Sequence, residues 1–126
     1  MKKMYLTLPL FALIVACGGG TEKKEDAGAT TAVVDLSSNP DYQKGLELVG
    51  KSDCLTCHKV SEKNIGPAYK DVAAKYENTD ENVKMLAAKI IKGGQGVWGA
   101  IPMTPHTSLS EADAEQMVKY ILLLKK

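Results

Sequence analysis

Residues 54–58, CLTCH, hold two of the three cysteines and one of the two histidines of this chain of 126 residues. A Cys-x-x-Cys pair can cycle between dithiol and disulfide, supply half of a zinc site, or carry a covalently attached haem. The segment alone leaves these three chemistries open, and the rest of the sequence distinguishes among them.

A zinc site is disfavoured because a closed structural site needs four ligands. The four candidates would be Cys54, Cys57, His58 and His106. Cys57 and His58 are adjacent, so they are poorly placed to share one tetrahedral ion. The sequence contains no second Cys-x-x-Cys and no His-x-x-x-His pair.

A redox-active pair is also disfavoured, because the thioredoxin-like motif opens a helix after a strand in an α/β unit. The sequence around residues 54–58 indicates helices and loops. Haem attachment requires Cys-x-x-Cys-His, which these residues match in full. Two thiols can add to the two vinyl groups on one haem edge, and the following histidine can then ligate the iron.

Residues 93–109, GGQGVWGAIPMTPHTSL, show no regular period, and loops of this length in compact domains are usually functional. Met103 lies in this loop between Pro102 and Pro105, which stiffen the backbone. Met/His pairing on a haem iron raises its reduction potential. Met103 is therefore the candidate second ligand. The other methionines are assigned to the core or to the N-terminal segment: Met1, Met4, Met85 and Met117.

The N-terminus begins with a short basic segment, MKK, followed by an apolar stretch that ends before Cys17. A bilayer span needs about 20 apolar residues, so residues 1–16 indicate a secretory signal peptide. Residues 14–17, IVAC, resemble the lipobox of bacterial lipoproteins. This resemblance implies cleavage before Cys17, lipidation of its sulfur and acylation of its new amino group. Several acyl chains give stable membrane anchoring.

Residues 17–38 are rich in glycine, threonine and charged residues, and they indicate a flexible linker before a domain at 39–126. The charge balance is 16 basic against 15 acidic residues, and all the basic residues are lysines. Bidentate arginine contacts to phosphates or bases are unavailable, so nucleic acid is not an expected partner.

The domain is expected to be all-α. A first helix is expected from Asn39 and Pro40, with Tyr42, Leu46 and Val49 on its buried face. A short helix should follow Pro67. The remaining two helices are expected at 80–92, ended by two glycines, and from a Ser110 cap onward. Their buried faces are expected to comprise Val83, Leu86, Ala87, Ile90, Ala114, Met117, Val118 and Ile121.

Four segments together resemble small bacterial class I cytochromes c of the cytochrome c-551/c-552 type: CLTCHKV, IGPAYKDVAAKY, GGQGVWGAIPMTPH and SEADAEQMVKYIL. The resemblance runs from about Tyr42 to the C-terminus. It implies the class I cytochrome c fold, with about four short helices wrapped around one covalent haem c. It also implies a monomeric one-electron carrier with no enzymatic activity and no small-molecule substrate.

The same resemblance implies roles for individual residues. Cys54 and Cys57 would hold the haem by thioethers, with His58 as proximal and Met103 as distal ligand. The Pro67 carbonyl would accept a hydrogen bond from His58 Nδ1. Trp98 would donate its indole N–H to a haem propionate, and Lys89 would be a weaker candidate for propionate pairing. Gly45 would lie where the first helix crosses the last, near Tyr120.

The loop after Met103 departs from the family pattern. Members often carry an asparagine near the methionine sulfur, whereas this chain has His106 there, in a segment one residue longer. We interpret His106 as a surface residue of the loop rather than a residue that tunes Met103.

These observations predict an electron carrier that is exported and lipid-anchored through Cys17 on the outer side of a bacterial membrane, in the periplasm or at the cell surface. Its partners would be a respiratory donor and a terminal oxidase or reductase. Lys51, Lys59 and Lys63 could steer an acidic partner toward the haem. The alternatives are a haem subunit of a larger oxidoreductase complex, or a haem peroxidase or gas sensor if Met103 is not a ligand.

Overall fold

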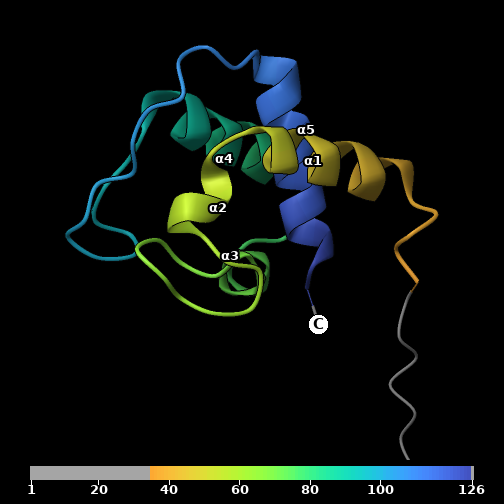
Figure 1. Cartoon of the computed structure of the whole chain (residues 1–126), viewed down its shortest axis with the longest axis horizontal. Helices are drawn as coiled ribbons and strands as arrows, with labels where there is room; N and C mark the ends of the chain where they lie inside the picture. The colour runs from red at the N-terminus through yellow and green to blue at the C-terminus, as the bar shows by residue number, and fades with distance from the viewer. Residues whose placement is uncertain (1–34, 126) are drawn as a thin grey trace, which may run out of the picture. The chain divides into compact units, whose positions relative to one another are not determined.

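The computed structural model describes residues 35–125 (Figure 1). The predicted signal peptide, the lipidation site Cys17 and most of the predicted linker lie outside the described residues, as does Lys126. Within the described part, five α-helices follow one another: α1 (Pro40–Lys51), α2 (Cys54–Cys57), α3 (Tyr69–Lys75), α4 (Asp80–Lys92) and α5 (Glu111–Leu123). The only extended pairing there is an isolated antiparallel bridge between Gly94 and Met103.

The helix ends follow from local chemistry. The Asn39 side chain accepts hydrogen bonds from two backbone N–H groups in the first turn of α1, and Pro40 occupies the first helical position. The Ser110 hydroxyl accepts from Asp113 N at the start of α5 and donates to Asp113 Oδ2 at 2.7 Å. Gly93 ends α4 with a φ of 77°, a backbone conformation that favours glycine.

Helix α5 is the centre of the packing, because it contacts α1, α3 and α4. Gly45 permits the close crossing of α1 and α5. A Cβ at Gly45 would lie 2.5 Å from Gln116 O and would collide with Tyr120 Cβ. This contact confirms the expected role of Gly45.

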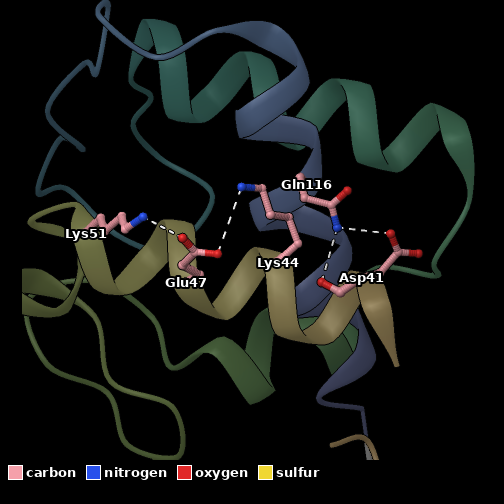
Figure 2. Close-up of polar contacts among 5 residues, drawn as sticks. All are labelled: Asp41, Lys44, Glu47, Lys51 and Gln116. Atoms are coloured by element: carbon pink, nitrogen blue, oxygen red, sulfur yellow. Dashed lines mark hydrogen bonds and ion pairs between the residues drawn. The ribbon is translucent and has the colours of Figure 1, made fainter. Parts of the chain in front are cut away.

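Polar contacts on α1 complement this crossing (Figure 2). Gln116 Nε2 donates to both the backbone carbonyl and the carboxylate of Asp41, at 3.1 and 3.0 Å. Farther along the exposed face of α1, Glu47 pairs with Lys44 and Lys51. The hydrogen bond from Lys51 lowers the pKa of the Glu47 carboxyl.

The structure corrects two expectations about the helices. Leu46 was expected on the buried face of α1 but is 43% exposed, because the buried stripe runs through Gly45 and Val49 instead. The short helix α2, which carries the cysteine pair, was not predicted. The expected faces of α4 and α5 are confirmed except for Leu86, which is half-buried.

None of the helices within residues 35–125 has the length and apolar character required to cross a bilayer.

Candidate functional site

A cavity of about 440 Å³ lies among the helices and the loops that connect them. Apolar side chains from four helices line it, among them Val49 of α1, Val72 of α3, Ile90 of α4 and Val118 of α5. The remaining lining includes Cys54, Cys57, His58 and Met103. The fold thus brings the cysteine motif and the loop methionine, far apart in sequence, to one apolar space.

Helix α2 places both thiols on one side of a single helical turn. Cys54 and Cys57 are its first and last residues, three positions apart, and residues at this spacing share a helix face. His58 follows directly, and its backbone N–H donates to Cys54 O at 3.0 Å. Both cysteines are half-buried, and neither is in a disulfide. Burial raises the pKa of the Cys54 thiol above its ordinary value.

The His58 ring is held by neighbours. Its Nδ1 lies 2.8 Å from Pro67 O, which can only accept, so Nδ1 carries the proton and Nε2 keeps the lone pair that can ligate a metal. The Tyr69 ring stacks on it, with centroids 5.4 Å apart and an interplanar angle of 21°. Gly66 lies against the ring as well, since a Cβ there would come within 2.8 Å of Nδ1. A histidine oriented in this way is typical of metal ligands.

Met103 lies in the loop between α4 and α5, part of which runs along the left side of Figure 1. Its backbone N–H donates to Gly94 O at 2.8 Å. Gly93 makes this approach possible, because a Cβ there would lie 2.6 Å from Met103 O. Between these residues the chain closes a turn, with Gly96 N donating to Gly99 O at 3.0 Å. The loop returns on itself, and this places Met103 at the cavity.

Trp98 and Lys89 also line the cavity. The Trp98 side chain is 38% exposed, and Lys75 Nζ from α3 lies 5.6 Å from the centroid of its ring. The Lys89 side chain lies against Gly94, with Cδ 3.0 Å from where a Cβ on that glycine would be. Both residues are therefore at the rim of the cavity, where charged substituents of a bound group could reach them.

His106 is less exposed than we expected of a surface residue. Its side chain is only 20% exposed, and its Nε2 lies 3.0 Å from Asp53 Oδ1, beside the start of α2. The contact joins residues 53 positions apart in the sequence.

The chemistry of this cavity fits a covalent haem. Its walls are apolar, as a porphyrin requires; two free thiols share one helical turn beside it; and a histidine with a fixed tautomer and a thioether both line it. Soft thioether and imidazole donors suit iron in haem better than they suit a hard cation.

Comparison with known proteins agrees with this site. The family model of cytochrome c matches residues 42–125. The chain belongs to the cytochrome c family. It is 47% identical over 83 residues to cytochrome c-552 of Nitrosomonas europaea, covering 66% of this chain and 81% of that protein. It is 44% identical over 79 residues to cytochrome c-552 of Hydrogenobacter thermophilus, covering 63% and 80%.

The fold agrees as well. The crystal structure of the wild-type Nitrosomonas europaea cytochrome c552 superposes with a TM-score of 0.60 at 48% identity, covering 64% of this chain and 99% of that one. The protein therefore has the class I cytochrome c fold and carries one haem c, attached through Cys54 and Cys57. It is a c-type cytochrome of the electron-carrying kind, like the small cytochromes that it resembles.

Three features of the site were not found from the sequence. Tyr69 stacks on His58, Gly66 makes room for that ring, and Asp53 binds His106. The position of Gly66 and Tyr69 beside Pro67 in the IGPAY segment was a usable signal for the first two. No local pattern links Asp53 to His106.

Proposed function

We propose that the iron of the haem c is ligated by Nε2 of His58 and by the sulfur of Met103, and that the chain passes single electrons between protein partners. The observation that carries this proposal is the convergence of the cysteine pair, His58 and Met103 on one apolar cavity. The haem would supply an iron that can be ferrous or ferric, so the protein would accept one electron from a donor protein and give one to an acceptor protein.

The residues around the haem would limit the structural change that accompanies electron transfer. The Pro67 carbonyl and the Tyr69 ring hold His58 in one orientation, so the proximal ligand need not move when the charge on the iron changes. The apolar part of the walls would limit the access of water to a bound haem. Trp98 and Lys89 at the rim would take the haem propionates, as the resemblance implies.

The test of the ligand set is Met103→Ala. We expect loss of the weak far-red band that arises from methionine sulfur on ferric iron, a lower reduction potential and binding of carbon monoxide at neutral pH. Met85→Leu is the matched control, because Met85 lines the same cavity from α4 and a volume-conserving change should leave the band intact. Carbon monoxide binding by the unmodified protein, with no far-red band, would instead favour a peroxidase or gas sensor.

We further propose that the chain is exported and anchored through lipids on Cys17, and that it serves respiratory partners as a monomer. The N-terminal sequence supports this, since the signal-like segment ends in a lipobox-like IVAC.

Among the three lysines considered for docking, Lys51 and Lys59 each pair with a glutamate, and Lys63 lines the cavity. Lys63 is thus the strongest candidate for steering an acidic partner.

The anchor is tested by Cys17→Ser, which should release the cytochrome from the membrane fraction and abolish incorporation of radioactive palmitate. Detergent extraction of the native protein then separates a free carrier, which should migrate as a monomer, from a subunit of a larger complex. Retention of the Cys17→Ser protein in membranes would contradict the lipid anchor.

A further inference from the structure

The side-chain contact between His106 and Asp53 connects two segments that the haem site needs. Asp53 is the residue before Cys54 and the N-cap position of α2, whereas His106 is three residues beyond Met103. The Asp53 side chain is 79% exposed and makes no capping hydrogen bond to α2. Its contact with His106 is therefore not a by-product of helix capping.

His106 is firmly placed on the loop side of this contact. Its backbone N–H donates to Ile90 O in the last turns of α4, at 3.1 Å, and its carbonyl accepts from Leu109 N, also at 3.1 Å. The ring lines the cavity, and its Nδ1 is buried with no hydrogen-bond partner among residues 35–125. A ring that fully faced the solvent would satisfy both nitrogens with water, so this ring is turned inward, with Nε2 toward Asp53.

We propose that His106 and Asp53 form a clasp that holds the Met103 loop against the haem-attachment helix, so that His106 is a positioning residue for Met103. This rests on the proposed ligation of iron by Met103. The bond needs a proton on Nε2 to donate to the carboxylate, and both the neutral Nε2–H tautomer and the imidazolium provide one. The clasp opposes displacement of Met103 by keeping the loop closed.

The test uses the haem-loaded protein and Asp53→Ala, a change at an exposed side chain that removes the acceptor and leaves the loop sequence intact. The first readout is hydrogen exchange of the Met103 and His106 amides, which are bonded to Gly94 and Ile90. We expect both to exchange about three- to fivefold faster, the size expected for losing a partly exposed pair. Exchange of the amides of Met117 and Val118 in the core of α5 should be unchanged.

The second readout is the affinity of the ferric protein for imidazole, which must displace Met103 and thereby abolish the far-red band. We expect it to rise by a similar factor, about three- to fivefold. His106→Ala should do the same, and the double variant should match either single one, because both remove one bond. Glu62→Ala is the control: it breaks the Lys59–Glu62 pair, which joins neighbouring residues and does not touch the loop.

Two results would overturn the clasp. One is unchanged exchange and imidazole affinity in Asp53→Ala, and the other is full additivity of the two single changes. These outcomes are distinct from failure of the proposed ligation, which would appear as a missing far-red band in the unmodified protein. Exchange of the loop amides would still test the clasp in that case.

Discussion

At the scale of single residues, His58 is the side chain whose surroundings constrain it most closely. Pro67 accepts from Nδ1, Tyr69 covers one side of the ring, and Gly66 leaves the space that the ring occupies. The Pro67 contact was implied by family resemblance, and the structure contains it at 2.8 Å. Its contribution to iron ligation remains a prediction.

Gly66→Ala should disturb this arrangement, because the added Cβ would overlap the imidazole of His58. The ring or the loop must shift, and we expect a loss of about 1–3 kcal/mol in unfolding free energy, as for other overpacked sites. A shifted ring should also change the electron paramagnetic resonance spectrum of the ferric haem. Unchanged spectra and stability would show that the ring does not depend on this space.

At the scale of elements, the sequence best predicts helix termini, because capping residues act on the nearest turn. Caps such as Asn39 and Ser110 and the terminating Gly93 act within one turn, so the starts of α1 and α5 and the end of α4 could be located from the sequence. Helix α2 was missed because one turn is too short to show a period. Leu46 was wrongly placed on the buried face because Gly45 lies at the contact between α1 and α5, and a glycine adds nothing to a hydrophobic period.

The candidate site also divides into residues that the sequence reveals and residues that only the tertiary structure reveals. Its cysteines, His58 and Met103 were recognisable by residue type and spacing, whereas Asp53 and His106 were not. Their pairing depends on the path of the loop from α4 to α5, a tertiary property that leaves no sequence period. The partial burial of His106 follows from that path and not from its own polarity.

The crossing of α1 and α5 can be tested at Gly45, and Gly50 on the same helix provides the control. Gly45→Ala should lower the unfolding free energy by about 1–3 kcal/mol, because the methyl group would meet Tyr120 and the Gln116 carbonyl. Gly50→Ala, on the same helix with nothing within 4 Å, should instead raise it by about 0.5–1 kcal/mol through helix propensity. Denaturant titration of both variants gives the comparison. Equal effects would mean that the crossing is looser than the structure indicates.

At the scale of the whole domain, the cavity and the core are one structure. All five helices contribute walls to a space of about 440 Å³. Several of these wall residues, among them Val49, Ile90 and Val118, also belong to the hydrophobic core, so a haem held here would extend that core.

Buried tyrosines predict how stability changes at high pH. Burial raises the pKa of Tyr69, and also that of Tyr120, above the ordinary value near 10. Between pH 10 and the folded-state pKa the unfolded chain binds fewer protons, so the unfolding free energy falls as pH rises. Below about pH 10 the contribution is constant.

Tyr69→Phe should therefore flatten this decline while keeping an aromatic ring on His58. The largest slope that one such group can contribute is about 1.4 kcal/mol per pH unit. Denaturant midpoints of both proteins, measured in steps from pH 9 to 11, provide the comparison. Parallel curves would assign the alkaline loss to other groups.

The clasp also affects how this loop could be moved between proteins. Residues 93–109 begin at the end of α4 and finish at the cap of α5, and such a segment is a natural cassette for grafting into another small cytochrome. The cassette would carry His106 but leave Asp53 behind, since that residue belongs to the host's attachment helix. A graft that keeps the His106 contact therefore requires two changes in the host. One is the loop itself, and the other is a carboxylate at the position directly before the first haem cysteine.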